Sequence, residues 1–186
     1  MAKTNGSEAT KSRTHGSTTA VREITTSNQP DNPLIQALQT QVANGILLYL
    51  NYKHYHWQTF GPLFRDLHLL FDEFSAAVIA TVDEFAERIR MIGGNPVADP
   101  TAMVATATVK VATAKVVGAK GSMRQMVAEA DANVLTVIRE MRDGASLADD
   151  NGDPGTADLF ARVVQIHEKH EWFLREILEE GDGLID

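Results

Sequence analysis

Residues 61–96 read GPLFRDLHLLFDEFSAAVIATVDEFAERIRMIGGNP, and most of this stretch is predicted to form one long helix. The helix is expected to run from about Leu63 to Ile92. It ends at Gly93-Gly94-Asn95-Pro96, because glycine readily leaves the helical conformation and proline cannot continue a helix. Gly61-Pro62 separates it from the preceding segment. A helix of roughly 30 residues at 1.5 Å per residue is about 45 Å long.

Three further long helices are predicted on either side of this stretch. Apolar residues recur at three- and four-residue steps after Asn32, which predicts an amphipathic helix to about Thr59. Two more helices are expected over 122–144 and 156–180. Asp99-Pro100 resembles a helix start and predicts a short helix within the Ala/Thr/Val stretch at 99–119. The pattern therefore predicts an all-α four-helix bundle with a short extra helix in the connection between the second and third long helices.

Length and composition predict one folded domain with a tail at each end. The chain has 186 residues, of which 44% are hydrophobic, enough for a single core. Residues 1–32 are rich in small polar side chains and are expected to be a flexible N-terminal tail. The bundle domain is predicted over 33–181, and 182–186 form a short C-terminal tail.

The composition also limits the chemistry. Without cysteine the chain has no disulfide or thiolate metal site, so any metal must be held by His, Asp and Glu. A net charge of −8 argues against a strongly basic nucleic-acid-binding surface and suits a protein that attracts cations. No apolar run approaches the roughly 20 residues of a membrane span, and the N-terminal segment lacks the apolar stretch of a signal peptide. We therefore expect a cytoplasmic protein with no membrane segment.

Five residues form a candidate metal site: His56, His68, Asp72, Asp83 and Glu87, spaced H-x11-H-x3-D-x10-D-x3-E. The last four fall within roughly 100° of one another around the second long helix. Along the axis, however, His68 and Asp83 are about 22 Å apart at 1.5 Å per residue. Ligands of one metal centre must converge within a few ångströms. One copy of the helix therefore cannot close the site, and a solvated surface is the alternative reading of each pair alone.

A two-fold axis removes this difficulty, because the midpoint of residues 68 and 87 is also the midpoint of residues 72 and 83, at about 77.5. If the helix packs antiparallel against a second copy at that point, Asp72 meets Asp83 of the partner subunit. His68 then meets Glu87 of the partner subunit, and two equivalent sites result. Ser75-Ala76-Ala77 at the crossing are small enough for a close approach of two helices. The imidazole and carboxylate set suits Fe, Mn or Zn.

The same residues lie in motifs that resemble the signature of the Dps family of ferritin-like proteins, or mini-ferritins. The resemblance covers the first two long helices, and the general layout extends it to about residues 33–181. The motifs are Tyr55-His56-Trp57, Gly61-Pro62-x-Phe64-x-x-Leu67-His68-x-x-Phe71-Asp72-Glu73 and Asp83-x-x-Ala86-Glu87-Arg88-Ile89.

The resemblance implies a ferroxidase that stores iron in a shell of twelve subunits built from two-fold dimers. Each inter-subunit site would hold two iron ions, with His56, His68 and Asp72 from one subunit and Asp83 and Glu87 from the other. Hydrogen peroxide or oxygen would oxidise Fe(II), protecting the cell against oxidative stress. Trp57 beside the site would take up an oxidising equivalent, the alternative being a core aromatic.

Two further groups of residues have open roles. Asp149, Asp150, Asp153 and Asp158 lie in and after an acidic loop and could line an iron-entry pore, as similar segments do in this family, or form a solvated loop. His167 and His170 are three residues apart on the last helix and are either extra metal ligands or core-edge histidines. No Glu-x-x-His pair occurs in the chain, which disfavours the intrasubunit centre of ordinary ferritin.

The main alternative function is a DNA-coating protein of the nucleoid whose metal site is structural or filled by Zn or Mn. The predicted N-terminal tail has a net side-chain charge of only about +1. So few basic residues bind DNA weakly unless many tails act together. DNA is therefore a doubtful partner.

Overall fold

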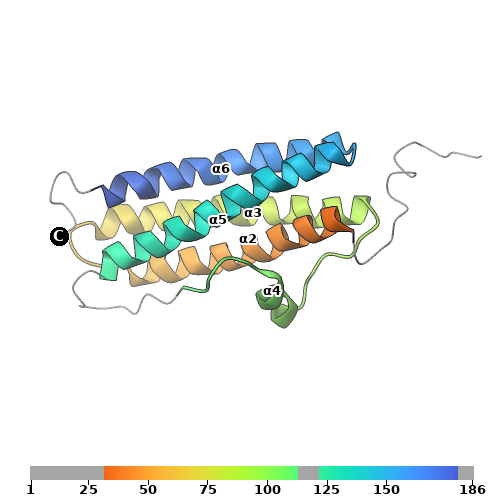
Figure 1. Cartoon of the computed structure of the whole chain (residues 1–186). Coiled ribbons are helices and arrows are strands. Elements are labelled where there is room, and N and C mark those ends of the chain that lie inside the picture. The colour runs from red at the N-terminus through yellow and green to blue at the C-terminus, as the bar shows by residue number, and fades with distance from the viewer. Residues whose placement is uncertain (1–31, 113–121, 180–186) are drawn as a thin grey trace, which may run out of the picture.

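The computed structural model describes residues 32–112 and 122–179, which form four long helices and one short helix (Figure 1). The long helices lie side by side as a bundle: α2 (Pro33–Gln58), α3 (Phe64–Met91), α5 (Ser122–Asp150) and α6 (Pro154–Leu178). The short helix α4 (Pro100–Thr106) packs beside α2, outside the bundle. The predicted all-α four-helix bundle with one extra short helix is confirmed. The predicted tails fall almost entirely on 1–31 and 180–186, outside the described residues.

Local capping sets where the helices start. Asn32, Asp99 and Asp153 each precede a proline, and each side chain accepts a hydrogen bond from a backbone N–H of the first turn. The predicted start at Asp99-Pro100 is confirmed by its 2.8 Å bond from the Ala102 N–H. At the end of α3, Gly93 has φ of 89°, a left-handed conformation in which glycine carries no steric cost.

Helix α5 is longer than the sequence pattern predicts, because Gly144 lies within the helix and does not end it. A Cβ at residue 144 would lie 2.7 Å from the Phe160 ring of α6. The glycine therefore allows a close approach of α5 to α6. As a result α5 continues to Asp150, so Asp149 and Asp150 belong to its last turn and not to a loop.

The core lies between the four long helices and is built from their apolar faces. Large fully buried side chains come from each helix, among them Tyr52 of α2, Phe71 of α3, Met126 of α5 and Phe160 of α6. Apolar burial of this kind is the main stabilising term of such a bundle.

Buried asparagines hold the long connection between α3 and α5 in place. Asn51 of α2 donates to the Lys110 carbonyl and accepts from the Ala112 N–H, each at 2.8 Å. Asn133 of α5 accepts from the Lys110 N–H and donates to its carbonyl. Asn44 accepts from the Thr108 N–H at 2.9 Å. Because these amides pair backbone groups outside any helix, they fix the extended segment against α2 and α5.

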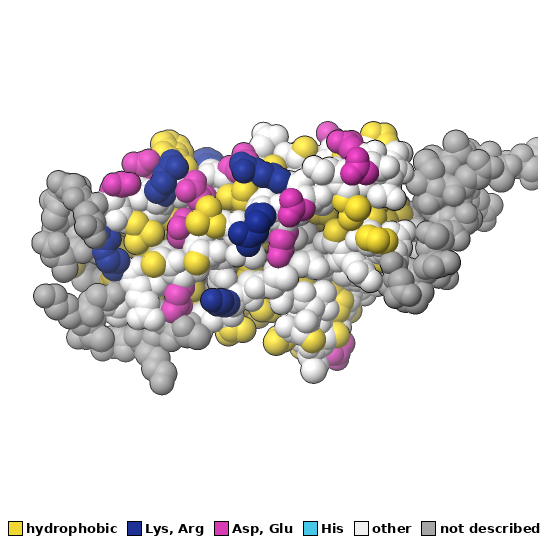
Figure 2. All heavy atoms as spheres, viewed as in Figure 1, with side chains coloured by type: hydrophobic (Ala, Val, Ile, Leu, Met, Phe, Trp, Pro, Cys, Tyr) yellow, Lys and Arg dark blue, Asp and Glu magenta, His cyan; other side chains and the backbone are white. Residues whose placement is uncertain are grey.

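No helix in the described parts of the chain combines the length and apolar character needed to cross a bilayer. On the face shown in Figure 2, basic and acidic side chains are interspersed and do not gather into areas of one sign.

Candidate functional site

His56 and His68 form a stacked pair where α2 ends and α3 begins. The hairpin between these helices brings the last turn of α2 beside the second turn of α3. The two imidazole rings have centroids 3.6 Å apart and planes 21° apart, and Phe64 stacks on the outer side at 5.1 Å from His68. The structure thus brings together two of the five predicted metal ligands.

Each histidine of this pair is held by the backbone of the other. His56 Nδ1 lies 2.7 Å from the His68 carbonyl oxygen, and His68 Nδ1 lies 2.9 Å from the His56 carbonyl oxygen. Since a carbonyl only accepts, Nδ1 of each ring is the donor in these bonds. In the neutral imidazole, Nε2 then keeps a lone pair that is free to bind a metal ion.

Asp72 lies one turn after His68 and forms an ion pair with Lys53 of α2. The hydrogen bond from Lys53 and its positive charge lower the pKa of Asp72 below its usual value. The carboxylate is therefore charged and already has a cationic partner in the single chain. Lys53 is not among the site residues predicted from the sequence, although its position three residues before His56 places it on the same face of α2.

Asp83 and Glu87 are exposed on the second half of α3. Asp83 is 15 residues from His68, which corresponds to about 22 Å along the helix. Within residues 32–112 and 122–179 of one chain, no three His, Asp or Glu side chains lie close enough together to hold a metal ion. The five predicted ligands therefore form two separate groups on one subunit.

An exposed stripe on α3 connects the two groups. Ala76, Ile79 and Ala80 are exposed, and they occupy the same side of the helix as Asp72 and Asp83. Ser75, which the sequence analysis placed at the crossing point, is instead 1% exposed and donates to the Asp72 carbonyl. The small side chains on the outer face are thus Ala76 and Ala80.

The other predicted site residues lie in different surroundings. Trp57, at the end of α2, is 69% exposed and is not a core aromatic in the single chain. His167 and His170 lie in the bundle core, at 2% and 4% exposure. His170 stacks on Phe74, so this placement gives no support to the two histidines as extra ligands beside His56.

The four acidic residues of the predicted pore divide into two kinds. Asp149, Asp150 and Asp158 are exposed. Asp153 is 4% exposed and pairs with Arg88 of α3 at 2.5 Å. Burial alone would raise its pKa, but hydrogen bonds from Thr156 and Arg88 hold the pKa of Asp153 below its usual value. Its carboxylate is committed to capping α6 and joining α6 to α3, so it is not available to line a pore.

Comparison with known proteins gives a consistent result. The family model of the ferritin-like domain matches residues 35–184. The DNA protection during starvation protein 1 of Deinococcus radiodurans is 37% identical over 78% of this chain and 68% of its own length. The structure of Dps from Thermosynechococcus elongatus has a TM-score of 0.76 and 48% identity, over 82% of this chain and 94% of that one.

A third comparison concerns the metal chemistry. The Dps protein of Vibrio cholerae O1 is described as a member of a broad superfamily of ferritin-like diiron-carboxylate proteins. Its structure has a TM-score of 0.71 and 29% identity, over 78% of this chain and 89% of that one.

Proposed function

We propose, because this chain belongs to the Dps family of ferritin-like proteins, that it is a ferroxidase and iron-storage protein with sites shared between two subunits. In this proposal it forms a cytoplasmic dodecameric shell built from two-fold dimers, oxidises Fe(II) and keeps the Fe(III) inside. The observation that carries the proposal is the stacked His56–His68 pair, in which the backbone holds Nδ1 of each ring and leaves Nε2 for a metal ion.

The stacking favours a site for two metal ions over a site for one. A lone pair lies in the plane of its imidazole, and the planes of these two rings are nearly parallel, with centroids 3.6 Å apart. Two donors in separate, nearly parallel planes cannot both point at one ion at the usual nitrogen–metal distance of about 2.0 to 2.1 Å. Each can bind a separate ion, as in two-metal sites, where the ions lie roughly 3.5 to 4 Å apart. Two Fe(II) per site fit these residues.

The partner subunit is proposed to complete the site through the exposed stripe of α3. Ala76 and Ala80 allow two copies of the helix to approach closely, and Ile79 gains from being covered. Antiparallel packing about residues 77 and 78 would bring Asp83 and Glu87 of one subunit to His68 and Asp72 of the other. The carboxylates would neutralise the charge of the ions, and the imidazoles would complete the ligand set.

Two adjacent Fe(II) ions suit hydrogen peroxide as the oxidant. Each ion gives up one electron, and the two electrons break the O–O bond to give two hydroxide ions and two Fe(III). Because both electrons are supplied together, no hydroxyl radical is released. Trp57, exposed beside His56, is proposed to take up an oxidising equivalent when a second Fe(II) is missing. Asp149, Asp150 and Asp158 are proposed to attract Fe(II) to the shell.

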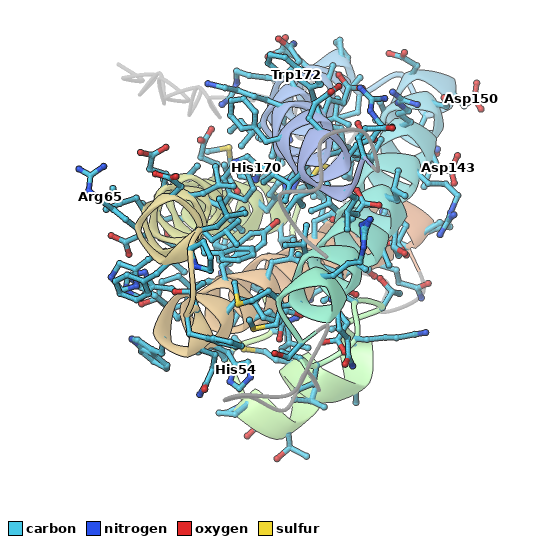
Figure 3. All side chains as sticks on the ribbon, turned by 90° about the vertical axis from the view of Figure 1, so that its left-hand side faces the viewer. His54, Arg65, Asp143, Asp150, His170 and Trp172 are labelled. Atoms are coloured by element: carbon cyan, nitrogen blue, oxygen red, sulfur yellow. The ribbon has the colours of Figure 1, made fainter. Side chains whose placement is uncertain are left out.

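Lys53 is expected to weaken binding of the ion that needs Asp72, because the ammonium group already occupies that carboxylate. Changing Lys53→Met should tighten the weaker Fe(II) binding event on the order of tenfold. Anaerobic calorimetric titration of the assembled particle with Fe(II) measures this. Arg65→Met is the matched control: Arg65 is also a cation near the site, but it is exposed and points away from the bundle (Figure 3). Equal titrations for Lys53→Met and wild type would contradict the role of Lys53.

The proposed function is tested by loading the purified particle with Fe(II) without oxygen and adding one pulse of hydrogen peroxide. Fe(III) absorbance and particle mass are followed together. We expect rapid oxidation at about two Fe(II) per peroxide in a particle of twelve subunits. A twelve-subunit particle with only background oxidation would reject the ferroxidase and favour a site that holds Zn or Mn.

A DNA-coating function is the second candidate, and the name of the Deinococcus relative is what favours it. Against it, the overall charge is −8, and charges of both signs are mixed on the face shown in Figure 2. Gel-shift assays over a salt series, with and without residues 1–32, distinguish the two functions. A protein bound through phosphate contacts loses affinity steeply as salt rises.

A further inference from the structure

Helix α6 places two histidines in the bundle core, away from the proposed iron site. His170 lies between α6 and α3 (Figure 3). Its ring stacks on Phe74 at 3.8 Å and meets Tyr52 edge-on at 6.0 Å. His167 lies 6.0 Å from His170 and is 2% exposed. The Nδ1 atom of each histidine is buried and has no hydrogen-bond partner among the described residues.

The surroundings of the two imidazoles offer little to stabilise a positive charge. Helix α3 contributes aromatic rings, and α2 contributes Tyr52, whose pKa is raised by burial so that it stays neutral. On α6 itself, Lys169 repels a charged His170. Asp131 of α5 is partly buried, and burial and the charge of Glu171 raise its pKa, so it too gains a proton in acid. Among the described residues, no carboxylate forms an ion pair with either imidazole.

We propose that His167 and His170 are an acid-sensitive lock in the bundle core beside α3, which loses its stabilising effect as the pH falls below 6.5. With both imidazoles neutral, the rings pack as core side chains, and His170 joins α6 to α3 through Phe74. When either imidazole gains a proton, a charge lies in the core beside a buried Nδ1–H that has no acceptor among the described residues, and fuller solvation of that charge requires that α6 move away from its neighbours. The lock belongs to the subunit itself and does not depend on the ferroxidase function.

The direction of the pH effect on folding stability, and the pH range in which it occurs, follow from the burial of the two imidazoles. Burial lowers the pKa of His167 to about 4 and that of His170 to about 3, against 6.5 in the unfolded chain. Below pH 6.5 the unfolded chain therefore binds more protons than the folded chain. The contribution of the two neutral histidines to folding stability is therefore fully present above pH 6.5 and is lost as the pH falls toward 4.

The described carboxyl groups with shifted pKa values act outside this pH range or in the opposite direction. The lowered pKa values of Asp72 and Asp153 cost stability only below about pH 4, where these carboxylates gain protons. The raised pKa of Asp131 means that the folded chain binds its proton more readily, which offsets part of the loss. Among the described groups whose pKa is shifted, the two histidines are thus the ones that drive destabilisation between pH 6.5 and 4.

The test compares wild type with His170→Phe and His167→Leu between pH 7.5 and 4.5. Each change keeps an apolar side chain in the core and removes a titrating group. From pH 7.5 to 5, each wild-type imidazole is expected to raise the unfolding constant about 30-fold, and each variant should lose its share of that rise. Denaturant unfolding and particle mass are measured at each pH. His54→Gln, which removes an imidazole outside the core, is the matched control and should behave as wild type.

A second measurement needs no variant. Hydrogen–deuterium exchange at the imidazole C2 position, read by mass spectrometry on the wild-type particle, reports both the pKa and the burial of each histidine. We expect His167 and His170 to exchange slowly and to remain neutral at pH 5. Titration of both near 6.5 in the intact particle, or an unchanged acid response in the two variants, would overturn the proposal.

Discussion

Changing Asp83 and Glu87 together to alanine is expected to abolish fast Fe(II) oxidation while the particle still assembles. Both side chains are exposed in the single chain, so removing them costs little folding stability. In the proposed dimer they are the only ligands that a subunit gives to its partner's site. Without them each ion keeps only the donors of one subunit, and we expect the oxidation rate to fall on the order of 100-fold or more. Stopped-flow absorbance of Fe(III) after a peroxide pulse measures the rate.

The control for this variant removes two other carboxylates from the same helix. Asp66 and Glu73 are exposed on α3, and Asp66→Ala with Glu73→Ala changes the charge by the same amount. We expect the control to oxidise Fe(II) at close to the wild-type rate. Light scattering on both proteins shows whether the twelve-subunit particle is retained. A wild-type rate in the variant that lacks Asp83 and Glu87 would show that these residues are not ligands of the oxidising site.

Local patterns in the sequence were sufficient to predict most of the fold. Helix starts depend on neighbouring residues, so Asp99-Pro100 could be identified from two adjacent positions. The end of α5 could not, because the role of Gly144 is set by Phe160 of another helix. A glycine that ends a helix and a glycine that allows close packing look alike in a sequence.

The candidate site shows the same division between local and distant information. Helical spacing predicts that Asp72 and His68 share a face of α3. The stacking of His56 on His68 joins α2 to α3, so spacing within one helix does not predict it. The pairing of Lys53 with Asp72 depends on how α2 and α3 are aligned, and the pairing of Asp153 with Arg88 joins residues far apart in the chain. Such ion pairs are decided by tertiary contacts that periodicity does not report. They also bear on the proposed function, since Lys53 pairs with a proposed metal ligand, Asp72, and Arg88 pairs with Asp153, a residue of the predicted pore.

Mixing two inactive variants is expected to restore activity, because each lacks a different half of the shared site. One variant carries His68→Ala and Asp72→Ala, and the other carries Asp83→Ala and Glu87→Ala. In a mixed dimer, the intact His68 and Asp72 of one subunit face the intact Asp83 and Glu87 of the other. That dimer has one complete site and one site that lacks all four of the substituted ligands.

The size of the recovery is itself a prediction. Random pairing makes half of the dimers mixed, and each mixed dimer has one working site of two, so co-assembled particles should regain about a quarter of the wild-type oxidation rate. The two variants are unfolded and refolded together, and the same proteins refolded separately and then mixed are the control. Only exchange of subunits can produce the recovery, because a site within one chain stays broken in both variants. Co-assembled particles that remain inactive would therefore place the oxidising site within a single subunit.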